Sequence, residues 1–253
     1  MLVQRVLGVF LVIAIFSPGL AALPADDLQS ASEAGKIAFV LVTEPGASGA
    51  KQATETIRNA MKQVEKSVIV ELNRADSANA VLVAKYRLAG APVPLILVFA
   101  SNGAIAGGNL AAKLTSEQLV NMVPSPKKSE VLEALQAGQA IFLTASDKEM
   151  STKSDILNIC AVACGQMKGK SRSIAIDMDD KKEASFLKEL GIKPQSAEPV
   201  TVVINGQGQV TGSFNGPVDV SKLVQAANKR VAGCSPSGCG GKPCGPTKKK
   251  KGK

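Results

Sequence analysis

The side chains of this chain best suited to chemistry are its five cysteines, because its 253 residues include no histidine. The lack of histidine excludes the Ser-His-Asp and Cys-His pairs that activate a nucleophile, and it also excludes His-ligated metal sites. A cysteine thiolate can still act as a nucleophile, as a disulfide partner or as a ligand of a soft metal. The positions of the cysteines therefore decide which chemistry is available.

Cys160 and Cys164 are four residues apart in a segment with a helical pattern, so they lie on one face of that helix. The same face carries Ile156, Ala163 and Met167, which favours the interpretation of both cysteines as small core residues. The pair lies well past the amino end of the helix, where the helix dipole does not activate a thiol. A local disulfide or a thiol switch is the alternative interpretation.

The three remaining cysteines recur every five residues in a tail, 233–253, that is rich in Gly, Pro, Ser and Lys; they are Cys234, Cys239 and Cys244. Such a composition does not form a packed core, so we expect a disordered tail. Because five is an odd number, at least one thiol is free or bonds another molecule. A disulfide to a partner or to a second copy, binding of a soft metal such as Cu(I), and no specific role all remain open.

The net charge is +9, from 30 Lys and Arg against 21 Asp and Glu. Much of the excess lies in the tail, in a run formed by Lys248, Lys249, Lys250, Lys251 and Lys253. Two interpretations of this run remain open: it is a solvated segment, or it is attracted to an anionic surface such as phospholipid. Aromatic residues make up 3% of the chain, too few for base stacking, so we predict no nucleic-acid partner.

The first 25 residues have the anatomy of an export signal. Arg5 precedes an apolar run, 6–16, which ends at a Ser-Pro-Gly break followed by small residues around Ala21. A membrane-spanning helix needs about 20 apolar residues, more than this run provides. We therefore predict a signal peptide at 1–25 and a periplasmic or secreted protein, with an uncleaved amino-terminal anchor as the alternative.

Strand and helix patterns alternate along the rest of the chain, and their order occurs twice. In the first half we expect strands at 36–43, 68–72, 95–100 and 104–108, and helices at 51–65, 76–88 and 115–123. In the second half we expect strands at 140–145, 173–178, 200–204 and 209–214, and helices at 152–167, 181–190 and 218–231. The repeat predicts two tandem domains, 26–124 and 129–232, joined by a linker at 125–128.

Each half has the order strand, helix, strand, helix, strand, strand, helix. The first two strands must be parallel because a helix crosses between them. The last two must be antiparallel because a tight turn joins them, Asn102-Gly103 in the first half and 205–208 in the second. The predicted fold class is therefore α/β, with a mixed sheet flanked by helices in each domain.

Residues 83–108 carry a specific resemblance. A tyrosine near a helix end, a loop with a glycine, a proline that opens an apolar strand, and an Asn-Gly turn resemble the second half of the thioredoxin fold. The resemblance implies that the Val93–Pro94 bond is cis, and that the Glu198–Pro199 bond of the second half is cis too. It also implies that these two loops expose backbone on which a protein or peptide partner binds.

The resemblance places redox chemistry at a Cys-x-x-Cys that opens the first long helix, where the helix amino terminus lowers a thiol pKa. Ala47 and Ala50 stand at the two cysteine positions, and the buried acid of the family is replaced by Leu41. The corresponding segment of the second half, 147–152, also contains no cysteine. The resemblance therefore implies no dithiol exchange at the usual site, and we expect no catalytic residue, cofactor or metal there.

Two functions follow from these patterns, and they belong to different classes. The first is a redox-inactive binding or scaffold protein of an extracytoplasmic compartment, without enzymatic activity. The alternative is a thiol-disulfide or soft-metal-handling protein that uses Cys160 and Cys164 or the cysteines of the tail. In that case a partner linked by a disulfide through the tail is expected.

Overall fold

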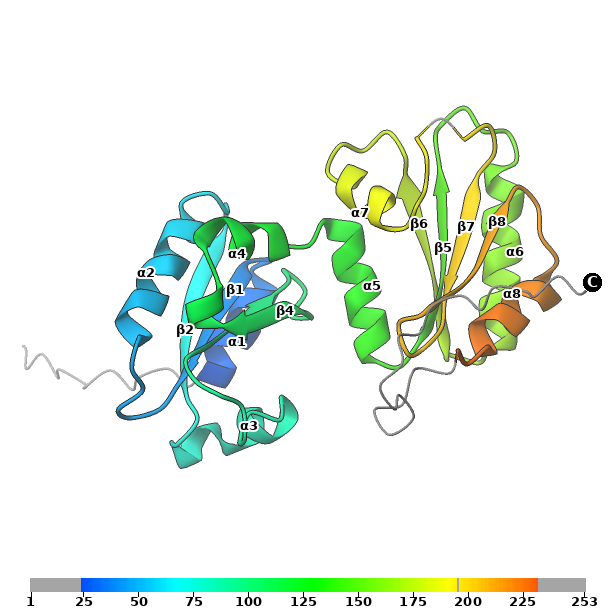
Figure 1. Ribbon diagram of the computed structural model, residues 1–253. Helices are drawn as coiled ribbons and strands as arrows, with labels where there is room; N and C mark the ends of the chain where they lie inside the picture. Colours follow the sequence, from blue (N-terminus) through cyan, green and yellow to red (C-terminus); the bar gives the residue numbers. More distant parts are fainter. Residues whose placement is uncertain (1–23, 195, 232–253) are drawn as a thin grey trace, which may run out of the picture.

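The structure is a computed structural model that describes residues 24–194 and 196–231 (Figure 1). Nearly all of the predicted signal peptide lies outside the described residues, and so do the three tail cysteines and the tail lysines. The described residues form two four-stranded sheets, each flanked by helices, which confirms the predicted fold class. Among them, no helix is both long enough and apolar enough to cross a bilayer.

The first domain contains α1 (Pro24–Glu33), β1 (Ile37–Thr43), α2 (Ala50–Met61), β2 (Ser67–Asn73), α3 (Ala80–Lys85), β3 (Leu95–Phe99), β4 (Ile105–Leu110) and α4 (Ser116–Met122). The second domain contains α5 (Pro126–Gln136), β5 (Ala140–Ser146), α6 (Lys153–Gln166), β6 (Ser171–Asp177), α7 (Ala184–Glu189), β7 (Val200–Ile204), β8 (Val210–Asn215) and α8 (Val220–Asn228). Short 3-10 turns at Ser77–Asn79 and Ala111–Lys113 precede α3 and α4.

The two sheets have the same topology. Their strand orders are β2-β1-β3-β4 and β6-β5-β7-β8. The first two strands of each domain pair in parallel, and the other pairs are antiparallel, as the sequence predicts. Equivalent positions follow from the register: Leu41 pairs with Ile96 in the first sheet, and Thr144 pairs with Thr201 in the second.

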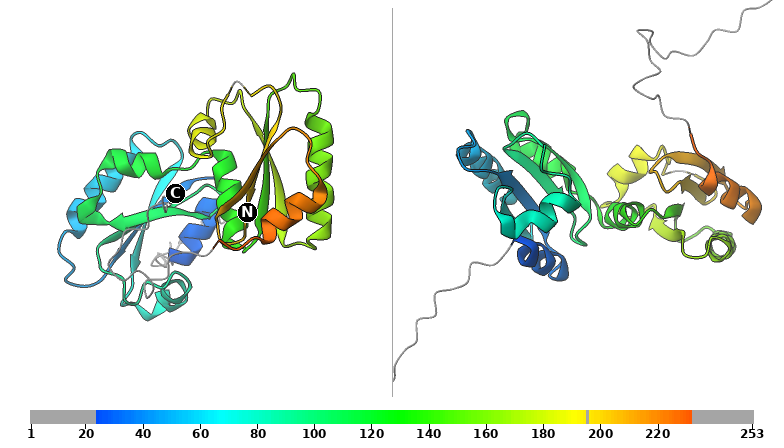
Figure 2. Two further views of the ribbon diagram at one scale, coloured as in Figure 1. Left: turned by 45° about the vertical axis from the view of Figure 1, so that its right-hand side comes forward. Right: turned by 90° about the horizontal axis from the view of Figure 1, so that it is seen from below.

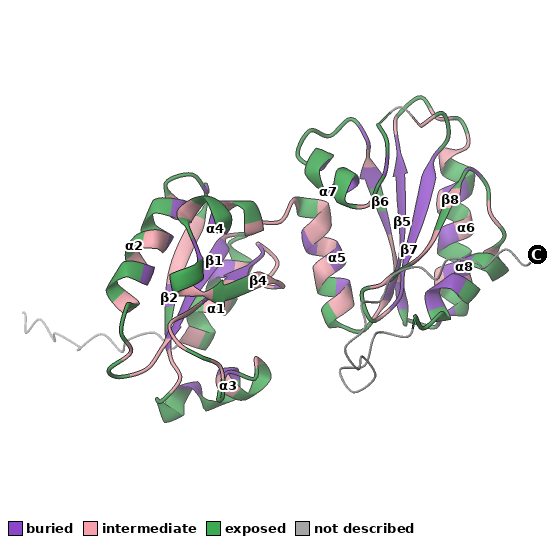
Figure 3. Cartoon of the chain, in the orientation of Figure 1, coloured by how far each residue is buried: buried purple, intermediate pink, exposed green. Residues whose placement is uncertain are grey.

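Helices cover both faces of each sheet, so the central strands are buried on both sides (Figure 3). In the first domain Phe39 and Leu41 pack with Ile57 of α2 on one face. On the other face Val40 and Val42 belong to a cluster that includes residues of α1 and α3. Two-sided burial explains why β1 and β5 are mostly apolar along their length rather than alternating.

Two helices, α1 and α5, were not predicted from the sequence. α5 begins inside the segment 125–128 that we predicted to be a linker. Ser125 caps it by accepting a hydrogen bond from the Lys128 amide, and Pro126 is its first residue. A Ser-Pro pair is thus a helix start here, as proline is favoured in the first turn of a helix. The apolar side of α5 is short, with Val131 and Ala134 packed on the second sheet, so its pattern is weak.

α5 packs on the second sheet and also contacts β4 of the first domain (Figures 1 and 2). The side-chain amide of Gln136 accepts a hydrogen bond from the Ile105 amide at 3.2 Å and donates one to the Ile105 carbonyl at 3.0 Å. The Asn102 side chain donates to the Ser129 carbonyl at 2.9 Å. The two domains therefore meet through a packed helix.

The Val93–Pro94 bond is cis, as predicted, and no other peptide bond of the described residues is. The prediction of a cis Glu198–Pro199 bond is therefore wrong. Residues 190–198 separate α7 from its proline, one residue more than the segment 86–93 that separates α3 from Pro94. The Glu198–Pro199 bond is trans, the isomer that is ordinarily favoured by about 0.5–1 kcal/mol.

Candidate functional site

The cis proline of the first domain faces the start of α2. The loop after β1 ends at Gly49, whose φ of +85° precedes the first residue of the helix. A cavity of about 60 Å³ lies between this loop and the proline loop. It is lined by Ser48, Gly49, Gln52, Ala53, Pro94, Ala111 and Ala112.

Ala47 and Ala50, which the sequence places at the family's cysteine positions, do not line this cavity. Ser48 and Gly49, which lie between those two positions, do line it. The first domain contains no cysteine at this loop or elsewhere, because no cysteine precedes Cys160. Ser48 is also no activated nucleophile of the serine–histidine type, because the chain has no histidine to take its proton.

Arg74, directly after β2, connects the loops of this corner. Its Nε donates to Glu44 Oε2 at 2.7 Å, and its Nη1 donates to the carbonyls of Leu88 and Ala91 in the loop before the cis proline. The hydrogen bond from Arg74 lowers the pKa of the Glu44 carboxyl. At the equivalent position of the second domain stands Met178, whose side chain is buried in the core.

The first domain has three defining features. Its strand order is β2-β1-β3-β4 with a single parallel pair, helices cover both faces of the sheet, and a cis proline opens β3 beside the start of α2. The second domain repeats all of these features except the cis bond. Both domains have the thioredoxin-like fold. The predicted tandem arrangement of thioredoxin-like domains is therefore confirmed.

No protein-family model matches the chain, and no curated protein matches it. Solved structures do. The first two thioredoxin domains of Saccharomyces cerevisiae Eps1p align over 85% of this chain and 100% of that one, with 12% identity and a TM-score of 0.30. Form II of human ERp44 aligns over 84% of this chain and 57% of that one, with 7% identity and a TM-score of 0.36.

A disulphide isomerase from Xylella fastidiosa Temecula1 aligns over 44% of this chain and 95% of that one, with 13% identity and a TM-score of 0.31. Identities this low describe overall fold alone. The assignment of the thioredoxin-like fold to this chain rests on its strand order, its pairing directions and its cis proline.

The cysteine pair of the second thioredoxin-like domain lies in the middle and last turns of α6. Cys160 is fully buried, and its Sγ is 3.4 Å from Thr144 Oγ1, which is in turn 3.4 Å from Thr201 Oγ1. Burial raises the pKa of the Cys160 thiol. Cys164 is half-buried, and both thiols are free. The interpretation of Cys160 as a core residue is confirmed, and no disulfide links it to Cys164.

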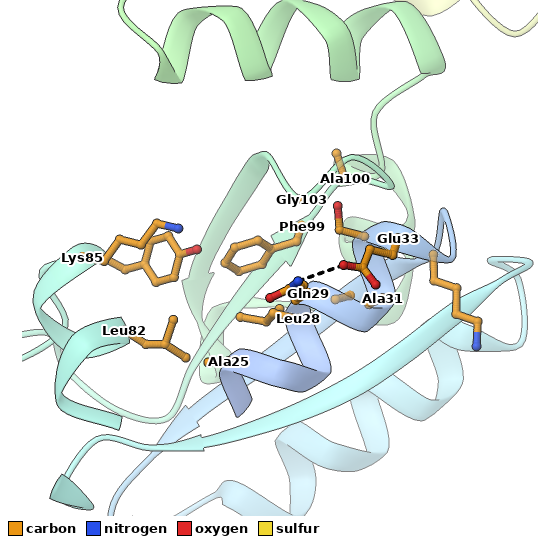
Figure 4. A pocket seen from close by; sticks show the side chains of 14 residues that line it. Ala25, Leu28, Gln29, Ala31, Glu33, Leu82, Lys85, Phe99, Ala100 and Gly103 are labelled. Atoms are coloured by element: carbon orange, nitrogen blue, oxygen red, sulfur yellow. Dashed lines mark hydrogen bonds between the residues drawn. The ribbon is translucent and has the colours of Figure 1, made fainter. Parts of the chain in front are cut away.

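A larger cavity, of about 450 Å³, lies between α1 and α3 of the first thioredoxin-like domain (Figure 4). Ala38 at the start of β1 and Phe99 at the end of β3 line it, so it lies at the opposite end of the sheet from Pro94. Tyr86 stands edge-on to Phe99, with 5.3 Å between ring centroids. The rest of the lining is Ala25, Leu28, Gln29, Ala31, Ser32, Glu33, Lys36, Leu82, Lys85, Ala100 and Gly103.

The charged groups of this cavity are two cations and one acid. Lys85 Nζ lies 5.1 Å from the centroid of the Tyr86 ring, and Lys36 is half-buried. Glu33 accepts a hydrogen bond from the Gln29 side chain at 2.8 Å, drawn as a dashed line in Figure 4. None of the three charged groups forms an ion pair with another residue of 24–194 or 196–231. The cavity thus combines an aromatic lining with two available cations.

The second domain fills the equivalent space. Leu135 of α5 takes the place of Ser32 of α1, since the two residues stand five positions before β5 and β1 respectively. Leu135 packs against the core and would lie 3.8 Å from a Cβ on Gly208, whereas Ser32 Oγ would lie 3.0 Å from a Cβ on Gly103. Sequence reasoning missed the cavity because it did not predict α1, which forms one wall.

Proposed function

We propose that this chain is a redox-inactive thioredoxin-like protein of an extracytoplasmic compartment, and that it binds a protein or peptide segment in the cavity between α1 and α3. The proposal rests on two observations about the first domain: it has a large cavity between α1 and α3, and it has no cysteine beside the cis proline, where the resemblance places redox chemistry. The corner keeps the cis proline but presents Ser48 and Gly49 to it, in a space of about 60 Å³. The cavity at the other end of the sheet measures about 450 Å³.

The thiols of the described residues support a function without dithiol exchange. A reactive cysteine needs thiolate character and access to solvent. Cys160 has neither, because it is fully buried and its pKa is raised by that burial. Thiol-disulfide or soft-metal chemistry through Cys164 or the tail cysteines is the alternative, and the experiments below detect it.

The lining of the cavity defines the chemistry of the partner. A volume of about 450 Å³ is within the range of about 300–1,000 Å³ found for ligand sites. Tyr86, which is half-buried and stands edge-on to the buried Phe99, offers ring surface to an aromatic or aliphatic side chain. Lys36 and Lys85 attract a carboxylate beside it. We therefore expect a segment in which an acidic residue neighbours an aromatic one.

The compartment is inferred from the amino-terminal pattern. Residues 1–25 have a basic start, an apolar run and a break before small residues, which is the order of an export signal. The tail lysines, Lys248 to Lys251 and Lys253, offer a second contact to an anionic surface such as phospholipid.

The first experiment measures binding to the cavity. 1-Anilinonaphthalene-8-sulfonate, an aromatic anion, is titrated into the mature chain and then displaced with reduced, carboxymethylated α-lactalbumin, an unfolded acidic chain. Ser32→Leu copies Leu135 of the second domain, fills the cavity and is expected to weaken both ligands about tenfold, equivalent to about 1.4 kcal/mol. Ser154→Leu, on the exposed side of α6, is the matched control and should bind as the wild type does.

Two results would contradict the proposal. One is equal affinity of Ser32→Leu and the wild type for both ligands. The other is turnover in an insulin-reduction assay that disappears with Cys160→Ser or with deletion of the tail, which would favour thiol chemistry.

A further inference from the structure

The turn between β3 and β4 has the cavity on one side and α5 on the other. Ala100 and Gly103 of this turn line the cavity. Asn102 and Ile105, one and two residues away from Gly103, make the hydrogen bonds to α5. One short segment therefore forms a wall of the proposed site and also the contact with the second domain.

The turn is internally rigid and closely fitted to α1. The Ala100 amide donates to the Ala104 carbonyl at 2.7 Å, and the Gly103 amide donates to the Ala100 carbonyl at 2.9 Å. Gly103 has a φ of +80°, and a Cβ there would approach Ser32 Oγ to 3.0 Å. Because Ala100 and Gly103 line the cavity and the turn has little clearance from α1, a shift of the turn would change the shape of the cavity.

The position of α5 is set by the second domain. Val131 and Ala134 pack in the core of the second sheet. The carboxylate of Glu183, itself 1% exposed, accepts a hydrogen bond from the Lys127 amide at 2.9 Å and another from the Ser125 hydroxyl. The second domain thus holds α5 by hydrogen bonds at its amino end and by core packing along the helix. The last residue of α5, Gln136, contacts the first domain.

We propose that Gln136 is a positioning residue for the cavity of the first domain. Through Gln136 the second domain fixes the β3–β4 turn, which forms one wall of the cavity, although no described residue of the second domain lines the cavity. This inference rests on the proposed function. Gln136 bonds both backbone groups of Ile105, as a neighbouring strand would, and this fixes the turn before a ligand arrives. A wall ordered in advance lowers the entropy cost of binding. By reciprocity, a ligand in the cavity strengthens the contact between the domains.

The test compares two glutamines of the same helix end in the full chain. Gln136→Ala removes both hydrogen bonds to Ile105 and is expected to weaken 1-anilinonaphthalene-8-sulfonate roughly fivefold, the low end of the range for coupled sites. Gln139→Ala is the matched control. Its side chain donates to the Gly169 carbonyl at 2.9 Å, within the second domain, so the affinity should stay at the wild-type value.

Amide hydrogen exchange supplies a readout that a purely structural role does not change. Saturating probe should slow exchange of the Ile105 amide in the wild type, and should have a smaller effect on this amide in Gln136→Ala. Wild-type affinity in Gln136→Ala, or equal losses in both glutamine variants, would overturn the inference and leave the proposed function intact. A wild type that does not bind the probe would contradict the proposed function first, and this inference with it.

Discussion

Arg74 and Glu44 form the ion pair that joins the loops around the cis proline. The Arg74 side chain is 17% exposed and the Glu44 side chain 37%, and Arg74 also donates hydrogen bonds to two carbonyls of the loop before Pro94. The second domain has Met178 at this place and no such connection. A single residue thus decides whether the two loops are joined by polar contacts.

This pair predicts an acid-sensitive contribution to stability. Because Arg74 lowers the pKa of Glu44 in the folded state, the unfolded chain binds more protons at this site as the pH falls. The contribution is fully present above the ordinary pKa of a glutamate and is lost as the pH falls through the lowered value. The urea midpoint should therefore drop less between pH 7 and about pH 3 in Glu44→Gln than in the wild type.

Glu65→Gln is the control for this measurement, since Glu65 is exposed and forms no ion pair with any residue the structure describes. It should keep the pH profile of the wild type. An unchanged profile in Glu44→Gln would show that the pair does not stabilise the corner.

At the scale of elements, the two domains differ most in how their first helices are used. α1 leaves a cavity beneath Ser32, whereas α5 fills the same space with Leu135 and reaches the neighbouring sheet. The start of α5 depends on the buried carboxylate of Glu183, at the amino end of α7. A carboxylate is favourable there because the amino end of a helix carries partial positive charge.

Glu183→Ala should lower the free energy of unfolding by about 1–3 kcal/mol, because the Lys127 amide and the Ser125 hydroxyl lose their acceptor in a buried place. Glu183→Gln should recover most of this loss, since an amide accepts from Lys127 and donates to Ser125. Urea unfolding followed by circular dichroism measures both variants. Equal stability of the alanine variant and the wild type would mean that this contact is not needed to position α5.

Most strands and the longer helices could be predicted from the sequence, because burial on both faces leaves a continuous apolar run and packing on one face leaves a helical period. α5 was missed because its first residues, Ser125 and Pro126, are typical of linkers as well as of helix starts. The residue pattern before Pro199 resembles the one before Pro94, so it does not distinguish the trans Glu198–Pro199 bond from the cis Val93–Pro94 bond. The cavity arises from two helices far apart in sequence, so no local motif marks it.

At the scale of the whole molecule, the two thioredoxin-like domains share one topology and differ in detail. The first domain keeps the cis proline, the polar corner and the cavity. The second has Leu135 in the space equivalent to that cavity, the buried Cys160 and the helix that connects the domains.

The central claim is that this protein binds its partner without using sulfur. The most direct test is the affinity of a variant with all five cysteines replaced by serine for reduced, carboxymethylated α-lactalbumin, measured beside the wild type. We expect equal affinities, because no cysteine lines the cavity. Loss of binding in a serine variant whose circular dichroism spectrum and urea midpoint match those of the wild type would contradict it.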